Sequence, residues 1–208
     1  MRKSDLLLYL VTDRGMAQGH LEEIVETAIS NGVTIVQLRE KQATFEEFCE
    51  KAVIMKGICK KHNIPLIIND NIEVCLAVDA DGVHLGSSDC DIALARKMLG
   101  SDKIIGGSAR DIERAKLLES QGADYLGVGA VFGTSTKVDA KTISPKILAE
   151  ITGSVSIPVV AIGGVSESNI GELNNTGISG VAVVSAIIKA KNVQETTQNL
   201  VKQLKKIV

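Results

Sequence analysis

Short apolar runs recur along the chain at near-even intervals, and the segments between them carry apolar residues at helical spacing. The runs are rich in Val, Ile and Leu along their whole length, which is typical of strands buried on both faces of a parallel sheet. This pattern predicts eight strands, over residues 6–11, 34–38, 66–69, 82–85, 104–107, 125–128, 158–161 and 180–184.

Helix signals fill the gaps between these runs. Residues 21–30 place an apolar stripe on one face and end at Asn31-Gly32, a common helix stop. Thr44 and Glu47 form a capping-box pattern at the start of the next helix, and Ser144-Pro145 opens a later one. Further helices are predicted to begin at Asn71, at Asp89 or Asp91, at Asp111, at Ser168 or Asn169, and at Val193.

Eight strands alternating with helices predict a closed (β/α)8 barrel, a TIM barrel, formed by one domain over residues 1-208. The length agrees, because α/β barrels of about 200–250 residues form a single domain. An open doubly wound sheet is the alternative. It is weaker because no GxGxxG follows the first apolar run, and eight even units close more naturally than they stack.

Composition narrows the class of protein. Hydrophobic residues make up 45% of the chain and aromatic residues only 2%, so the core must be aliphatic. A formal net charge of −2 provides no general field for nucleic acid or membrane, and any anion site must be local. The four cysteines lack CxxC spacing and indicate reduced thiols in a cytoplasmic protein. The apolar run at the N-terminus has six residues, too few for a signal peptide or a membrane span.

Cations follow the second predicted strand directly. Gln37 lies in that strand, and Arg39 and Lys41 come just after it, two residues apart. On an extended backbone these two cations point the same way, and convergent cations at a strand end suit a polyanion such as a diphosphate. The alternative is a solvated pair of charges at the end of a strand.

Carboxylates follow the next two strands. Asn69 and Asp70 end the third strand, and Asp89 lies just beyond the fourth. Carboxylate oxygens without competing His or Cys ligands suit Mg²⁺, which needs one or two carboxylates besides substrate phosphates. The alternative is that both aspartates are only helix caps or turn residues.

The later strands end in small and hydroxyl-bearing residues. Ser108 follows the fifth strand, either to bind a ligand or to start a turn, and the loop after the sixth carries Thr134, Ser135, Thr136 and Lys137. That loop could close over an anion or be a solvated polar loop. Backbone N–H groups of Gly164 and Ser185, after the seventh and eighth strands, are where these barrels commonly hold a phosphate.

Two anion sites on one rim favour chemistry that joins or separates two small phosphorylated substrates, with diphosphate as the leaving group. His84, inside the fourth strand, is interpreted as a packed barrel residue rather than a base. No Ser-His-Asp or Cys-His arrangement emerges, which disfavours nucleophilic hydrolysis. The sequence leaves the oligomeric state open.

With these residues in place, the chain resembles the thiamine-phosphate synthase family over nearly its full length. The matching segments are LVTD, GVTIVQLREK, PLIINDNIEVCLAVDADGVHLG, IIGGSAR, GADYLGVGAVFGTSTK, IPVVAIGGV and GVAVVSAI. The resemblance implies a (β/α)8 transferase that couples hydroxymethylpyrimidine diphosphate to a thiazole phosphate and releases diphosphate.

The resemblance also implies roles for individual residues. Asp70 and Asp89 would bind Mg²⁺, and Arg39, Lys41 and Lys137 would neutralise the departing diphosphate in a dissociative substitution. The pyrimidine diphosphate would contact Gln37, Arg39, Lys41, Asn69, Ser108 and Lys137. The thiazole phosphate would contact Thr134, Ser135, Thr136, Gly164, Val184 and Ser185.

The chain departs from the family pattern in three places. Ser87 replaces a usual Gln, GAVFGT replaces GPIFPT in the loop after the sixth strand, and Arg110 stands where SAH is usual after the fifth. An alternative is a thiazole tautomerase-like isomerase on the same fold, which would use a His at the position of Arg110. A further alternative is a non-catalytic sensor of a phosphate-bearing ligand.

Overall fold

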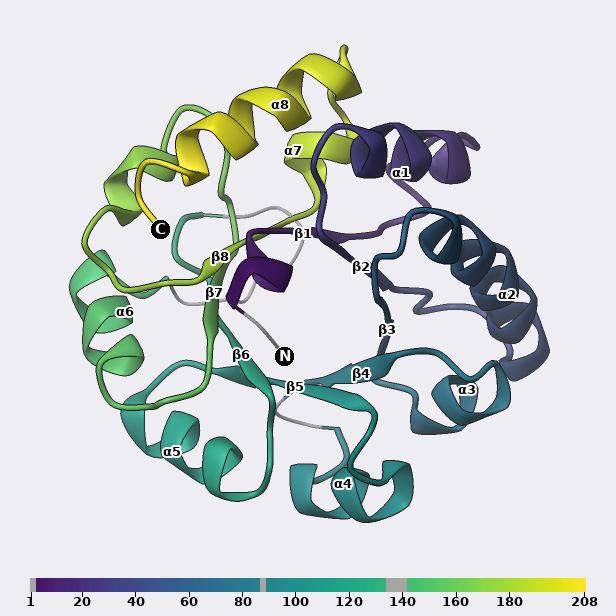
Figure 1. The fold of residues 1–208 in the computed structure, drawn as a ribbon, viewed down its shortest axis with the longest axis horizontal. Helices are drawn as coiled ribbons and strands as arrows, with labels where there is room; N and C mark the ends of the chain where they lie inside the picture. Colours follow the sequence, from purple (N-terminus) through teal and green to yellow (C-terminus); the bar gives the residue numbers. More distant parts are fainter. Residues whose placement is uncertain (1–2, 87–88, 134–141) are drawn as a thin grey trace.

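The computed structural model describes residues 3–86, 89–133 and 142–208. Within them, eight parallel strands form a closed ring and helices cover its outside (Figure 1). The strands are β1 (Leu8–Val11), β2 (Ile35–Leu38), β3 (Leu66–Asn69), β4 (Gly82–Leu85), β5 (Ile104–Ala109), β6 (Tyr125–Gly129), β7 (Val159–Ile162) and β8 (Gly180–Val183). Each strand pairs with the next along the chain, and β8 returns to β1 with Leu8 opposite Val181. The predicted (β/α)8 barrel is confirmed, and the open sheet is wrong.

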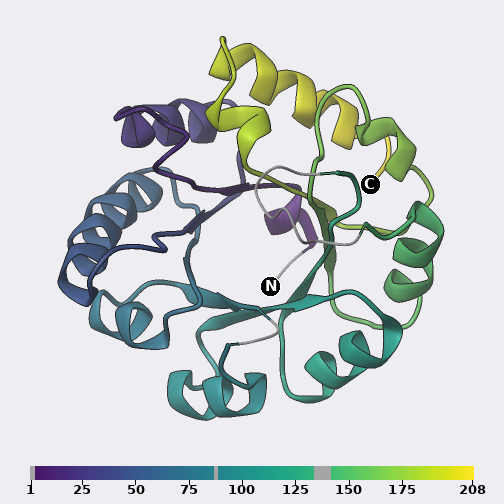
Figure 2. The same ribbon diagram turned by 180° about the vertical axis from the view of Figure 1, so that it is seen from behind.

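Helices connect successive strands along most of the chain. They are α1 (Leu21–Ser30), α2 (Phe45–Lys61), α3 (Ile72–Ala77), α4 (Ile92–Leu99), α5 (Ile112–Ser120), α6 (Pro145–Thr152), α7 (Ser185–Ile188) and α8 (Val193–Leu204). Two short 3-10 helices complete the described elements, η1 (Lys3–Leu6) and η2 (Ile170–Leu173). η1 projects inside the ring in both views of the molecule (Figures 1 and 2).

Most of the predicted helix starts are seen in the hydrogen bonds. Thr44 Oγ1 accepts from Glu47 N at 3.2 Å, and Glu47 Oε2 accepts from Thr44 N at 3.0 Å, which completes the capping box. The side chain of Asp91, not that of Asp89, caps α4. Asn169 precedes η2 without a side-chain cap, and the helix predicted there is a short 3-10 helix.

The first strand is shorter than predicted. Leu6 belongs to η1, and β1 begins two residues later at Leu8. Leu6 is fully buried against the inside of the barrel, beside Tyr9. Its apolar character therefore reports burial and not strand pairing, a distinction that hydrophobic pattern alone does not make.

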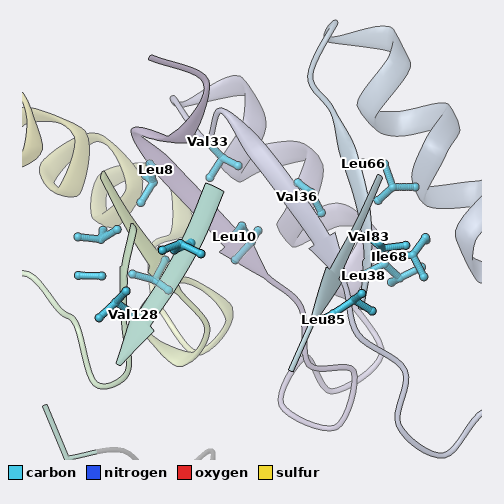
Figure 3. Packing of buried hydrophobic residues seen from close by; sticks show 14 of the residues in the cluster. Leu8, Leu10, Val33, Val36, Leu38, Leu66, Ile68, Val83, Leu85 and Val128 are labelled. Atoms are coloured by element: carbon cyan, nitrogen blue, oxygen red, sulfur yellow. The ribbon is translucent and has the colours of Figure 1, made fainter. Parts of the chain in front are cut away.

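Alternate residues of each strand enter two separate cores. Leu8 and Leu10 pack outward into the large cluster under the helices, whereas Tyr9 and Val11 point into the barrel. Figure 3 shows part of the outer cluster, where residues such as Leu10 and Val36 lie on neighbouring strands. Because both faces are covered, β1 is buried at all four positions, which explains its continuous apolar run. Since all the strands are parallel, their carboxyl ends meet at one rim.

Candidate functional site

A cavity of about 460 Å³ extends from the barrel interior to the carboxyl ends of the strands. Every predicted site residue that the structure describes lines it: Gln37, Arg39, Lys41, Asn69, Asp70, Asp89, Ser108, Gly164, Val184 and Ser185. Thr134, Ser135, Thr136 and Lys137 lie outside the described residues. The fold thus brings together side chains separated by up to about 150 positions, while their chemical roles stay a prediction.

Alternation along the backbone after β2 separates the charges there. Arg39 and Lys41 line the cavity. Glu40 points the other way and pairs with Arg14 at 2.7 Å and with Lys51 at 3.3 Å, its side chain only 6% exposed. The convergence expected for two cations two residues apart is therefore present.

Residues at the end of β1 hold Arg39 in position. Its guanidinium Nη1 donates to Asp13 Oδ2 at 3.1 Å, and its backbone N donates to Thr12 Oγ1 at 3.0 Å. The side chains of Arg39 and Asp13 are 14% and 21% exposed, so this pair is partly shielded from water. Asp13 has no role in the sequence argument, although it follows the first strand in the same way that Arg39 follows the second.

Asp70 and Asp89 are not helix caps. Asn71 caps α3 by accepting from Val74 N, and Asp91 caps α4. Asp70 takes a left-handed backbone conformation with φ of 65°, and its carboxylate accepts from Asn69 Nδ2 at 2.6 Å. The carboxylate of Asp89 accepts from Gly86 N at 2.5 Å. The interpretation of both aspartates as helix caps is wrong, the turn alternative is not contradicted, and both residues line the cavity.

These carboxylates fit a hard divalent cation by the chemistry of their donors. Both are exposed oxygen ligands that line one cavity beside the cations of β2. Within the described ranges, no three His, Cys, Asp or Glu side chains are grouped to hold a metal. Two carboxylates alone suit Mg²⁺, because this ion keeps several waters and takes its remaining ligands from phosphates.

Beneath the rim, five polar side chains form a continuous series of hydrogen bonds inside the barrel. Gln37 Nε2 donates to the Tyr9 hydroxyl at 2.8 Å, and Tyr9 and Tyr125 share a hydrogen bond of 2.8 Å. The Tyr125 hydroxyl lies 3.0 Å from His84 Nδ1, and His84 Nε2 lies 3.0 Å from Ser108 Oγ. Burial raises the pKa of Tyr9 and of Tyr125 well above that of a free phenol, so both hydroxyls keep their protons.

The tyrosines are residues that the sequence argument missed. They are the only two tyrosines of the chain, and each lies in a predicted strand, a signal that could have identified them. A phenol inside an otherwise aliphatic barrel needs a hydrogen-bond partner. His84 is inside the barrel, as interpreted from the sequence, but it also lines the cavity and uses both ring nitrogens.

The opposite side of the rim is built from backbone. Val131 N donates to Ile162 O at 3.0 Å and Phe132 N to Gly163 O at 2.9 Å, so the chain leaving β6 runs beside the chain leaving β7. Gly164 has φ of 68°, and a Cβ there would lie 2.4 Å from Gly133 O. Only glycine fits this position without a shift of the neighbouring loop.

The start of α7 continues this backbone surface. Ser185 is the first residue of α7, and Val184 before it has no side-chain acceptor to cap the first turn. Val184 and Ser185 both line the cavity. Among the residues that the structure describes, this side therefore offers backbone groups and little side-chain charge.

Two further arginines line the cavity near β5. Arg110 follows the strand, and Arg114 lies one turn into α5, where its backbone N donates to the capping Asp111 at 2.7 Å. Among the described residues, the buried Nε of Arg114 has no hydrogen-bond partner. Arg110 faces the cavity rather than only solvent, and the sequence argument did not single out Arg114.

Comparison with known proteins agrees with this arrangement. Residues 8–187 match the family model described as thiamine monophosphate synthase. The thiamine-phosphate synthase of Ruminiclostridium cellulolyticum is 53% identical over 199 residues, 95% of each chain. That of Methanobrevibacter smithii is 50% identical over 205 residues, 99% of this chain and 98% of the relative.

A solved structure gives the same result at the level of coordinates. Thiamine phosphate pyrophosphorylase from Pyrococcus furiosus superposes with a TM-score of 0.91 at 38% identity, over 99% of this chain and 98% of that one. None of the described helices combines the length and the apolar character that a bilayer crossing requires. Because a family model matches most of its length and relatives are about 50% identical to it, this chain belongs to the thiamine monophosphate synthase family.

Proposed function

We propose that this chain couples hydroxymethylpyrimidine diphosphate to a thiazole phosphate, forming thiamine phosphate and releasing diphosphate. One observation carries the proposal beyond family membership: among the described residues, a side of the rim rich in charged side chains and a side lined by small, uncharged residues belong to one cavity. Two phosphorylated substrates need two anion sites at a distance that lets their reactive carbons and nitrogens meet. A single-ligand sensor needs only one.

The cations after β2 are assigned to the diphosphate. Arg39 and Lys41 would bind its oxygens and offset the charge that develops as the C–O bond breaks. Arg39 is suited to this role because its Asp13 partner fixes the guanidinium while Arg39 still lines the cavity. Gln37, Asn69 and Ser108, which line the same cavity, would contact the pyrimidine diphosphate.

Asp70 and Asp89 are the residues that would hold Mg²⁺ at the charged side. When bound, Mg²⁺ would supply further neutralisation of the phosphate oxygens. The neighbouring Asn69 amide and Gly86 backbone N–H each donate to one of these carboxylates and so orient it.

The backbone side is assigned to the thiazole phosphate, through Gly164, Val184 and Ser185. Thr134, Ser135 and Thr136 are assigned to the same phosphate and Lys137 to the diphosphate, on the family resemblance alone. Because the bond to the diphosphate breaks first in a dissociative substitution, the thiazole nitrogen captures a cation and no strong base is needed. Holding both substrates in line would supply much of the remaining rate.

The test is direct. The purified chain is mixed with both phosphorylated substrates and Mg²⁺, and thiamine phosphate and diphosphate are measured together, with each substrate omitted in turn as a control. The proposal expects one diphosphate released for each thiamine phosphate formed. Tight binding of either ligand without turnover would contradict it. We place this reaction in the reducing cytoplasm, in keeping with four cysteines that are all free thiols.

A further inference from the structure

At one end of the hydrogen-bonded series under the cavity, chemistry decides which group donates and which accepts. The amide nitrogen of Gln37 is a donor only, so the Tyr9 hydroxyl must accept from it. The other members, two phenols, an imidazole and a serine hydroxyl, can each donate or accept. Gln37 is only 4% exposed, which keeps water from competing for this end.

The donor and acceptor roles of the next groups follow from this first hydrogen bond. Since the oxygen of Tyr9 accepts from Gln37, its proton is directed to Tyr125, 2.8 Å away. The oxygen of Tyr125 accepts that proton and donates its own to His84 Nδ1 at 3.0 Å. A neutral imidazole that accepts at Nδ1 must carry its proton on Nε2.

We propose that Gln37 sets the tautomer of His84 through the two tyrosines, and that His84 in turn fixes Ser108 as a hydrogen-bond donor to the ligand. His84 Nε2–H donates to Ser108 Oγ across 3.0 Å, so the proton of Ser108 is turned toward the cavity that Ser108 lines. Phosphate oxygens accept hydrogen bonds, and a serine held in this state matches them. His84, Tyr9 and Tyr125 are positioning residues in this scheme.

The opposite direction would have a different chemical meaning. If His84 carried its proton on Nδ1, Nε2 would accept from Ser108, and the pair would resemble a hydroxyl activated by a base. Such a serine offers an oxygen, not a proton, to the ligand. The tautomer of one histidine therefore separates a phosphate-binding hydroxyl from a nucleophile.

The significance of Ser108 for diphosphate rests on the proposed function, but the tautomer does not. The chain has three histidines, so ¹⁵N-histidine labelling and long-range ¹H–¹⁵N correlation can resolve each ring at mildly alkaline pH. His20, whose side chain is 71% exposed and whose Nδ1 lies 3.5 Å from Glu23 Oε2, supplies the reference for a solvent-exposed ring, and His20→Asn and His62→Asn assign the signals. The expected spectrum shows His84 with Nε2 protonated and Nδ1 unprotonated. Protonation on Nδ1, or on both nitrogens, would overturn the proposal.

Two variants, near opposite ends of the series, test which end sets the donor and acceptor order. Tyr9→Phe cuts the link to Gln37, and His84 signals should move toward averaged values because both tautomers become populated. Ser108→Ala removes the other end and should leave the Nε2–H tautomer in place. A spectrum altered by Ser108→Ala and unchanged by Tyr9→Phe would contradict the proposal, because Ser108 and not Gln37 would then set the tautomer of His84.

Ligand affinity supplies the second measurement. Tyr9→Phe should weaken binding of the pyrimidine diphosphate by up to about tenfold, the effect of roughly one lost hydrogen bond to a charged group. The affinity for thiazole phosphate should stay unchanged. Equal losses for both ligands would contradict a positioning role. If the wild-type spectrum is as expected and no coupling activity exists, the proposed function fails while the tautomer assignment stands.

Discussion

The two sides of the cavity rim are made from different parts of the polypeptide. Over β2 to β4 the lining is side-chain charge, from Arg39, Lys41, Asp70 and Asp89. Over β7 and β8 it is backbone, exposed because Gly164 has no side chain and α7 begins without a side-chain cap. A charged site depends on which residues are present, whereas a backbone site depends on side chains being absent and on a conformation that permits close approach.

The largest expected effect is the loss of a charged rim ligand. Asp70→Asn keeps the size of the side chain, and asparagine tolerates the left-handed backbone at φ of 65°. We expect turnover with Mg²⁺ to fall by about 10²–10³, as when one group that stabilises developing charge is removed, with little change in melting temperature.

Asp79→Asn is the matched control for this variant. Asp79 also has a positive φ, 52°, but pairs with Lys103 and Lys56 and does not line the cavity. Its replacement should leave turnover near normal. A large stability loss in Asp70→Asn with near-normal specific activity would remove Asp70 from the metal site.

A second test compares Arg39, which precedes Glu40 in the sequence, with Arg14, which pairs with Glu40. Arg39→Gln should weaken pyrimidine diphosphate handling by about 10- to 100-fold, the range for a lost hydrogen bond to a charged group. Arg14→Gln breaks the pairs with Glu40 and Glu22 on the face turned from the cavity, and should lower stability more than activity. The measurement is kcat/KM for each substrate beside the melting temperature. Similar kinetic losses in the two variants would show that the alternation after β2 does not separate ligand binding from structure.

The backbone side is tested by adding one methyl group. Gly164→Ala places a Cβ against Gly133 O and forces alanine toward φ of 68°. We expect thiazole phosphate affinity to fall about tenfold, with a stability cost of about 1 kcal/mol from the backbone.

Gly100→Ala strains the backbone without the contact, because ψ of −170° at a positive φ is a conformation nearly confined to glycine. Gly100 has φ of 75°, and a Cβ there meets nothing within 4 Å. This variant should lose stability and keep both affinities. If Gly164→Ala weakens the pyrimidine diphosphate as much as the thiazole phosphate, the division of the rim into two sides is wrong.

The smallest expected effect concerns stability alone. Glu119 accepts hydrogen bonds from Ser156 Oγ, Ser156 N and Ile157 N, just before β7. The Ser156 hydroxyl bond and these backbone bonds lower the pKa of Glu119, so its contribution is present above the ordinary glutamate pKa and is lost as pH falls through the lowered one. Glu119→Gln should reduce the acid-side loss of unfolding free energy by about 1 kcal/mol or less, since the group is partly exposed, and so flatten the acid side of the melting-temperature profile. An unchanged acid profile would show that these bonds do not anchor the entry to β7.

The difference between the two sides also explains what the sequence predicted. Arg39, Lys41, Asp70 and Asp89 were found because charge at the end of an apolar strand is conspicuous in the sequence, and the barrel predicts that strand ends meet. Parallel strands buried on both faces leave a strong apolar signal, so the fold class followed from pattern. Strand ends were less certain, as Leu6 shows, because a buried residue of η1 is as apolar as a strand residue.

The parts that sequence did not predict depend on contacts between distant segments. The pairing of Arg39 with Asp13 and the series from Gln37 to Ser108 join several different strands. Arg114 was not singled out because it is the third residue of a predicted helix, and nothing in the local pattern shows that this position lines the cavity. Local periodicity contains none of this information.

We infer that the diphosphate and the divalent ion bind together at the charged side of the rim. The most direct test of this inference is a crystal structure of the chain with Mg²⁺ and inorganic diphosphate. We expect diphosphate beside Arg39 and Lys41, with the metal on Asp70 and Asp89. Diphosphate seated against Gly164 and Ser185, with the metal away from both aspartates, would contradict it.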